Sequence, residues 1–468
     1  MNEQKPIKVI LVLGLFSFLS ALSGSSTSLA IPKIALSLEI SSGLATWVLQ
    51  SGLITTTIFL VAFGHMGDLL SKNFIFFSGG IAFTIGSAIT GIAPTFSLII
   101  IGRIIQAFGS SMIMANSMGI VSDYFPDKKR AQALSYISMF ISAGSISGPA
   151  AGGFIMSVSS WRWIYLINVP LMIAVLIFGH HALPIPKVSI KQLKSATQGA
   201  NWMGQGLFTA GIIIFFLSGA IFQSRSNWLI GLITLVVGGA LTIYSFYQDD
   251  VANLPWISPK ILHNRPYLVS IMALLLVMLV NSVSNILLPF YFQSYGLMTP
   301  FQSGLLIMLQ SLVMLVLSPF AGYLADRVNR QLMTIIGLVI LTVSQIGYLL
   351  YPAGMNLTRI IIPIVINGIG MAFFLSPNNA LTMGLVDKSL TGIAGSLNSF
   401  SRTIGMTIGI SFGSSILFAL LPNVDQITPA LGETFLSAFR GVFYVAIAIS
   451  SLASIMVFVR YLRAKKTA

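Results

Sequence analysis

Residues 102–153 read GRIIQAFGSSMIMANSMGIVSDYFPDKKRAQALSYISMFISAGSISGPAAGG. The stretch predicts two membrane-spanning helices, joined by a charged turn at residues 123–130, with Arg103 inside the first helix. Glycines recur every four residues in the second helix and therefore share one helical face, along which another helix can approach closely. These glycines are Gly144, Gly148 and Gly152. We expect their face to be a seam that moves.

The composition is that of an integral membrane protein. Of the 468 residues, 55% are hydrophobic and 8% are charged, and the mean hydropathy is +0.90. Soluble domains carry about a quarter charged residues. Many uncharged runs exceed the roughly 20 residues that a spanning helix needs. We expect an all-α fold with fourteen spans: 8–32, 44–66, 73–92, 96–121, 132–156, 162–183, 203–222, 227–246, 267–292, 302–325, 332–351, 359–385, 394–421 and 436–460.

The net charge of +14 reflects membrane topology and does not indicate nucleic-acid binding. Of the 25 Lys and Arg residues, 18 fall in connections on one side of the predicted spans. The positive-inside rule makes that side cytoplasmic and places both termini there, in a bacterial-type cytoplasmic membrane. The chain has no cysteine, nucleotide-binding loop, metal cluster or nucleophile constellation, so we expect neither an enzyme nor a bound cofactor or metal.

Two patterns occur twice along the chain. Gly64-x-x-x-Asp68 returns 258 residues later as Gly322-x-x-x-Asp326. The glycine face returns 261 residues later. Its second copy is Gly405, Gly409 and Gly413. At about 33 residues for one span with its loop, both separations correspond to eight spans, so each helix matches the helix eight places later. This indicates two six-helix halves with two inserted helices. We expect an N-terminal half at 1–186, the inserted helices and flanking loops at 187–262, and a C-terminal half at 263–468.

Four segments resemble one family. They are GHMGDLLSK after the second span, GRIIQAFG in the fourth, SGPAAGGF in the fifth and SWRWIYLINVP at the start of the sixth. Together they resemble the major facilitator superfamily, in its fourteen-helix drug:proton antiporter branch, over essentially the whole length. The resemblance implies a transporter fold, small drug-like substrates, exchange for protons and a monomer.

Asp68 is the first candidate for a conformational switch. The resemblance implies that it belongs to a charge latch on the cytoplasmic side, together with Gly64, and Gly322 and Asp326 repeat the pattern. A carboxylate at a helix end can bind free N–H groups or a loop cation in one state only. The basic run that usually follows is thinned here to Lys72, and a solvated turn acid is the alternative.

Arg103 is a candidate for proton coupling, because it lies about 11 Å into its predicted span. An intramembrane arginine is costly unless it faces protein or water, so it indicates a functional site; the alternative is an arginine that extends along lipid to the interface. Four polar residues fall at a similar predicted depth, where a central cavity is expected. They are Ser23, Gln50, Asn281 and Gln310.

No acidic residue is predicted at mid-membrane. Relatives commonly carry an aspartate in the first span, and Ser23 stands at the matching position of SGSSTSLAIP. A proton-driven mechanism would then use an acid nearer a surface, and the candidates are Glu39 on the outer side and Asp123 on the inner side. Both can equally be solvated loop charges.

Pro149 follows Gly148 inside the fifth span. It removes one backbone hydrogen bond and permits a bend. We expect the two glycine faces to let two halves slide and rock, with ordinary small-residue packing as the alternative. A wider set of aromatic and amide side chains suits flat, amphipathic ligands, although for each aromatic alone packing is favoured over ligand contact. Besides the polar belt, this set comprises Tyr136, Phe140, Asn285, Phe374 and Asn378.

The sequence thus predicts a secondary active multidrug exporter that works by alternating access and proton antiport. One alternative is an exporter of a metabolite or siderophore with the same fold. Another is a membrane sensor without transport activity, although no loop is large enough to be a signalling domain.

Overall fold

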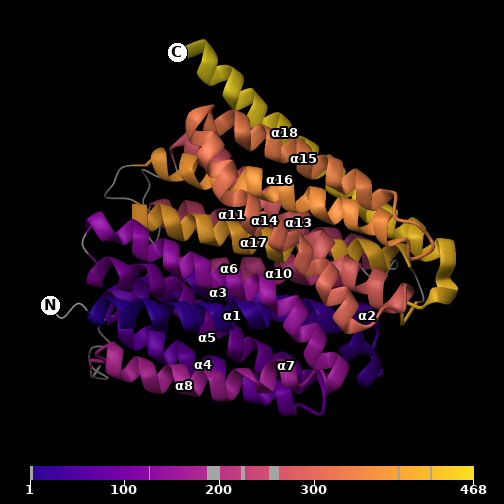
Figure 1. Cartoon of the computed structure of the whole chain (residues 1–468), viewed down its shortest axis with the longest axis horizontal. Helices are drawn as coiled ribbons and strands as arrows, with labels where there is room; N and C mark the ends of the chain where they lie inside the picture. The colour runs from indigo at the N-terminus through magenta and orange to yellow at the C-terminus, as the bar shows by residue number, and fades with distance from the viewer. Residues whose placement is uncertain are drawn as a thin grey trace. The chain divides into compact units, whose positions relative to one another are not determined.

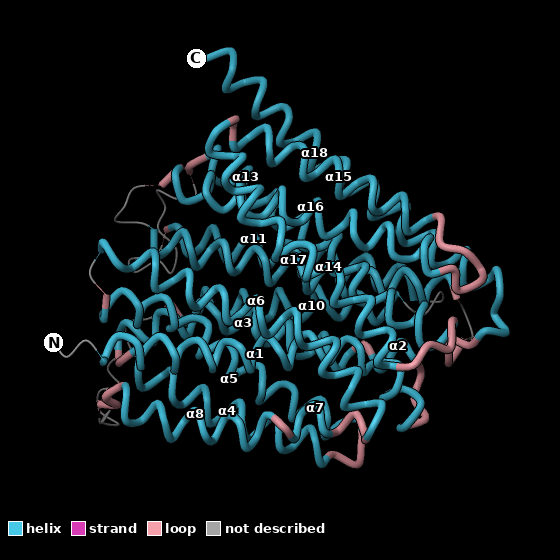
Figure 2. Tube along the Cα trace, viewed as in Figure 1, coloured by secondary structure: helices cyan, strands magenta, loops and turns pink. Residues whose placement is uncertain are grey.

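Fourteen helices of the computed structural model are long and apolar enough to cross a membrane. The structure describes residues 4–125, 127–186, 201–222, 227–251, 263–386, 391–421 and 424–467, apart from some side chains within them. No strand occurs in these ranges, and Figure 2 shows helices joined by loops. The predicted all-α membrane fold is confirmed.

Figure 1 shows the helices in chain order. They are α1 (Gln4–Ser37), α2 (Ser42–Ala45), α3 (Trp47–Leu69), α4 (Lys72–Ile92), α5 (Phe96–Tyr124), α6 (Asp127–Val158), α7 (Trp163–Leu166), α8 (Asn168–Ala182), α10 (Trp202–Phe222), α11 (Trp228–Asp250), α13 (Arg265–Pro289), the π-helical turn η2 (Phe290–Tyr295), α14 (Pro300–Arg327), α15 (Arg330–Leu349), α16 (Leu357–Gly384), α17 (Thr391–Leu420), the 3₁₀ turn η4 (Pro429–Leu431) and α18 (Gly432–Thr467).

Three predicted spans are interrupted or extended in the structure. The second begins with the separate short helix α2, and the sixth is divided into α7 and α8. The ninth continues past Pro289 as η2, because proline has no N–H to donate within the helix and a wider turn absorbs the defect. The other predicted ends differ from the observed ones by a few residues.

The chain folds into two compact units, which are described separately. Unit 1 comprises Met1–Glu39, Trp47–Phe215 and Leu235–Trp256; unit 2 comprises Ile40–Thr46, Phe216–Thr234 and Ile257–Ala468. Two of the unit boundaries fall inside α10 and α11, the two inserted helices. The predicted limits 1–186, 187–262 and 263–468 remain a prediction.

The same helix pairings occur in both units. In unit 1, α1 packs along α6, α5 packs against both α3 and α4, and α8 packs against α1 and α4 (Figure 1). In unit 2, α13 packs along α17, α16 against α14 and α15, and α18 against α13 and α15. The repeated pairings agree with a duplicated six-helix half.

Each unit has its own apolar core. In unit 1, Phe16, Phe76 and Phe77 are central, and the Phe16 and Phe76 rings meet edge to face at 4.7 Å. In unit 2, Leu338 and Phe374 have corresponding central positions. These cores hold the helices that carry the polar groups described next.

Candidate functional site

Arg103 lies on α5, 6% exposed, inside the candidate span Phe96–Val121. Thr95 caps the start of this helix by accepting a hydrogen bond from the Leu98 N–H. The Arg103 Nε donates to the Val48 carbonyl oxygen on α3 (2.9 Å), and Nη1 donates to Gln106 Oε1 (2.5 Å). The guanidinium is therefore held by neutral oxygen atoms.

Gln106 connects Arg103 to two other helices. Its Nε2 donates to Ser23 Oγ on α1 (3.1 Å) and to Ser87 Oγ on α4 (2.7 Å). These three side chains are all buried. Since the amide oxygen accepts from the arginine and the amide nitrogen donates to hydroxyls, Gln106 links the cation to α1 and α4.

Tyr165 on α7 completes the cluster. The Arg103 guanidinium carbon lies 5.6 Å from the centroid of the Tyr165 ring, within the range of a cation–π contact. The Tyr165 hydroxyl donates to Thr27 Oγ1 (3.2 Å), and Thr27 donates to the Ser23 carbonyl (2.7 Å). We call these residues the Arg103 cluster: Ser23, Thr27, Ser87, Arg103, Gln106 and Tyr165.

Unit 2 contains a matching cluster without a charge. Asn367 Nδ2 donates to Ser344 Oγ (3.2 Å), and Gln345 Nε2 donates to the same hydroxyl (3.0 Å). Ser284 Oγ donates to Gln345 Oε1 (3.5 Å). We call these four residues the Asn367 cluster. They are fully buried and join α13, α15 and α16.

Residue spacing relates the two clusters. Ser284 follows Ser23, and Asn367 follows Gln106, by 261 residues, the separation of the two glycine faces. At the same separation from Arg103 stands Ile364, which is fully buried. The duplicated framework thus holds an arginine in one unit and an isoleucine in the other.

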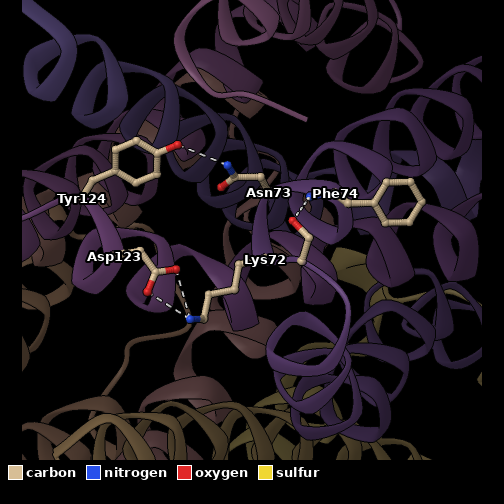
Figure 3. Close-up of polar contacts among 6 residues, drawn as sticks. Lys72, Asn73, Phe74, Asp123 and Tyr124 are labelled. Atoms are coloured by element: carbon tan, nitrogen blue, oxygen red, sulfur yellow. Dashed lines mark hydrogen bonds and ion pairs between the residues drawn. The ribbon is translucent and has the colours of Figure 1, made fainter. Parts of the chain in front are cut away.

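At the start of α4 and the end of α5, a second group of polar side chains is joined by hydrogen bonds and an ion pair (Figure 3). Lys72 Nζ lies 3.1 Å from both carboxylate oxygens of Asp123. Asn73 Nδ2 donates to the Tyr124 hydroxyl (3.3 Å) and to the Pro184 carbonyl after α8 (2.9 Å). An exposed ion pair and an amide therefore join the start of α4 to the end of α5. We call these contacts the clamp between α4 and α5.

In unit 2 the basic residue that matches Lys72 pairs with a different acid, at the junction of α14 and α15. Arg330 donates to Asp326 Oδ1 through Nε (2.9 Å) and Nη2 (2.7 Å). Arg330 follows Lys72 by 258 residues, as Asp326 follows Asp68. The side chain of Asp68 lies outside the described residues, so its role in a latch remains a prediction.

The two glycine faces pack inside their own units. A Cβ on Gly148 of α6 would lie 2.9 Å from the Leu22 carbonyl oxygen of α1, and Ser26 Oγ donates to the Gly148 carbonyl (2.8 Å). Gly144 and Gly152 also meet α1. In unit 2, Gly405 and Gly409 meet the α13 backbone, at Leu275 and Leu279.

We expected these faces to lie where two halves slide. Their closest neighbours instead belong to α1 and α13 of the same unit, because only glycine lets these helix backbones approach so closely. Pro149 is buried within α6 beside this contact. A gating role of the faces would therefore act through α1 and α13.

Comparison with known proteins identifies the family. The sequence profile of the Major Facilitator Superfamily matches residues 13–410. The chain belongs to the Major Facilitator Superfamily. Members of this superfamily are transporters, and the chain is a multi-pass membrane transporter rather than an enzyme.

Individual relatives within the superfamily differ in cargo. The chain is 26% identical over 457 residues to the riboflavin transporter RibZ of Clostridioides difficile, covering 97% of each chain. It is 25% identical to the multidrug transporter protein MdtP of Bacillus subtilis, covering 93% of this chain and 81% of MdtP. It is 23% identical to the lincomycin resistance protein LmrB of Listeria monocytogenes, covering 91% and 90%.

Among solved structures, a bacterial homologue of the human lysosomal transporter Spinster superposes with a TM-score of 0.69. The alignment covers 98% of this chain and 97% of the other, at 15% identity. The likeness shows a shared fold. The multidrug relatives and the fourteen candidate spans agree with the resemblance to the fourteen-helix branch of the superfamily.

The four residues of the predicted polar belt are buried or half-buried in this transporter. Gln310 Nε2 donates to Asn281 Oδ1 (2.6 Å), so two residues of the predicted polar belt meet in unit 2. Ser23 lies in the Arg103 cluster, and Gln50 is buried on α3. Each unit thus contains two of these four polar residues, and a central cavity at their depth remains a prediction.

Several cavity candidates have structural contacts instead. Phe374 lies in the apolar core of unit 2, where it packs rather than lines a cavity as expected. Asn378 is buried and donates to the Ser270 carbonyl (3.3 Å). Phe140 is half-buried beside Gly14, and Asn285 is half-buried on α13. Only Tyr136, at 42%, is substantially exposed among them.

The remaining switch and proton candidates lie near the surface. Glu39 is exposed, with a left-handed φ of 52°, just after α1. Asp123 is exposed and paired with Lys72. Gly64 has room for a Cβ, since Ala115 Cβ would lie 3.9 Å away, whereas a Cβ on Gly322 would lie 2.9 Å from Ser376 Oγ.

The sequence reasoning did not single out Gln106, Tyr165 and Arg402. Gln106 could have been found, because it lies one turn after Arg103 on the same helix. Arg402 also lies inside a candidate span, Leu397–Leu420, and its charge alone was sufficient reason to consider it. The approach of Tyr165 to Arg103 depends on tertiary packing.

Proposed function

We propose that this transporter is a secondary active exporter of small amphipathic compounds, which works by alternating access in exchange for protons. The observation that carries the proposal is the Arg103 cluster, a buried cation inside a membrane span of a duplicated transporter fold. The similarity to MdtP and LmrB supports export of drug-like compounds. We further propose a monomer in a bacterial cytoplasmic membrane with both termini inside.

For proton coupling we propose Asp123 as the first acid to test and Glu39 as the second. A proton on Asp123 would remove its attraction to Lys72, so protonation and opening of the clamp between α4 and α5 would be linked. Neither acid lies at mid-membrane, so the proton would bind near a surface.

The test uses everted membrane vesicles with and without the protein. Export predicts uptake of ethidium driven by a proton gradient, together with collapse of that gradient when ethidium is added. Asp123→Asn and Glu39→Gln should reduce uptake, with Glu433→Gln, which removes a surface acid paired with Arg440, as the matched control. Wild-type vesicles that accumulate neither ethidium nor anionic carboxyfluorescein above empty ones would contradict the proposal.

Flavin transport is the second candidate, because RibZ matches nearly the full length of both chains. Aromatic faces and amides suit a flat ring system with hydroxyl groups. Riboflavin fluorescence in proteoliposomes measures this directly. Riboflavin movement without ethidium movement would favour the flavin transporter over the multidrug exporter.

A further inference from the structure

Arg402 is an intramembrane arginine of unit 2. It lies on α17 within the candidate span Leu397–Leu420, and its side chain is half-buried. It forms no hydrogen bond or ion pair with any residue that the structure describes. A charge at such a position is costly unless an anion or water compensates for it.

No carboxylate that the structure describes serves this purpose. Every Asp and Glu whose side chain is described lies outside the helices or within one residue of the end of one, whereas Arg402 lies eleven residues after the start of α17. Glu433, near the start of α18, is already paired with Arg440. An anion from outside the protein can therefore neutralise Arg402.

Asn398 lies one helical turn before Arg402 and shares its face of α17. Its Nδ2 donates to Asn379 Oδ1 on α16 (3.2 Å), which fixes the amide. Its Oδ1 is buried and accepts no hydrogen bond from any described residue. This face thus offers a guanidinium and, about 6 Å away along the helix, an unused acceptor.

Arg103 differs in this respect. Its Nε and Nη1 already donate to Val48 and Gln106 inside unit 1. Arg402 has no such partners among the described residues, so its planar fork of N–H donors can bind a carboxylate through two parallel hydrogen bonds.

We propose that Arg402 and Asn398 form a binding site for the transported compound, and that this compound is an organic anion. Its carboxylate binds Arg402, and a hydroxyl or N–H group about one helical turn away donates to Asn398. This inference rests on the proposed export function and narrows its substrate class from amphipathic compounds in general to carboxylates.

The first test uses the wild-type protein in proteoliposomes and three dyes: anionic carboxyfluorescein, cationic ethidium and neutral riboflavin. The site predicts that carboxyfluorescein is transported in preference to ethidium. It also predicts that a non-fluorescent aromatic carboxylate, benzoate, competes with carboxyfluorescein. Methyl benzoate, which lacks the carboxylate charge, should compete at least about tenfold more weakly. Equal competition by acid and ester would overturn the proposal without requiring any variant.

The second test measures the Kd of the purified protein for carboxyfluorescein by fluorescence polarisation. Arg402→Gln should raise this Kd about tenfold or more, Arg402→Lys less, and Asn398→Ala about threefold. The matched control is Arg440→Gln, which removes an exposed, paired arginine and should leave the Kd unchanged. An unchanged Kd in Arg402→Gln would overturn the proposal.

The outcomes separate this inference from the proposed function. Transport of ethidium that is unaffected by Arg402→Gln, without transport of carboxyfluorescein, would leave the exporter in place and overturn the anion site. Transport of none of the three dyes would overturn the exporter and the site with it.

Discussion

The Arg103 cluster and the Asn367 cluster have the same framework but different charge. In both, a buried amide on one helix is hydrogen-bonded to hydroxyl groups, and three helices of one unit are joined. In unit 1 this framework also holds Arg103, whereas in unit 2 the matching position is Ile364. A six-helix unit can therefore pack without an arginine at this position. Because burying a charge costs free energy, the presence of Arg103 in unit 1 indicates a functional role.

The largest expected effect is on transport by Arg103→Gln. Removing the charged hydrogen bonds should lower the transport rate about 100-fold, with normal membrane insertion and elution profile. Everted-vesicle uptake measures this. Ile364→Leu, a volume-conserving change at the matching position of unit 2, is the control and should retain activity. Full activity of Arg103→Gln would remove the functional distinction between the two clusters.

The second-largest expected effect is on variants of the two glycine faces, one of which lies in each unit. Gly148→Leu and Gly409→Leu should each reduce transport at least about tenfold, because the new side chain would force α6 from α1 or α17 from α13. Gly24→Leu is the control, since nothing lies within 4 Å of a Cβ there. Thermal unfolding of the same variants separates loss of packing from loss of motion. A strong loss in one unit alone would show that the faces have different roles.

A smaller effect is expected on the unfolding free energy when the buried amide of each cluster, Gln106 or Asn367, is replaced. Gln106→Leu should cost about 2–3 kcal/mol of unfolding free energy, because Arg103 loses a charged hydrogen bond inside the membrane. Asn367→Leu should cost about 1 kcal/mol, because only a neutral hydrogen bond is lost. Denaturant unfolding in detergent compares the two. Equal costs would mean that Gln106 does not stabilise the cation.

The smallest effect concerns the surface ion pairs. A double-mutant cycle with Lys72→Met and Asp123→Asn should give a coupling of at most about 0.5 kcal/mol, since Asp123 is 52% exposed, and the coupling should disappear in high salt. Arg330→Met with Asp326→Asn should give a similarly small value. A coupling of several kcal/mol at Lys72 would indicate a buried latch in another state.

Much of the fold was predictable because hydrophobicity and glycine spacing act locally. Runs of apolar residues determine spans in a bilayer, and the repeat of the glycine face from Gly144 to Gly405 indicates duplication. The candidate site was predicted less completely. Arg103 and Ser23 were found from charge and position, and the structure places both in one cluster. Phe374 was misassigned, because an aromatic residue in a core and one in a cavity have the same local pattern.

By itself, the sequence determined a polytopic helical transporter with two related halves and an arginine within the membrane, because length, hydropathy and charge are properties of single segments. Only the tertiary structure decided which groups surround that arginine and which helices the glycines approach. Hydrogen bonds such as Gln106 to Ser23 and backbone contacts such as Gly148 to Leu22 join residues far apart in the chain. Their geometry depends on how the helices pack, which no local pattern specifies.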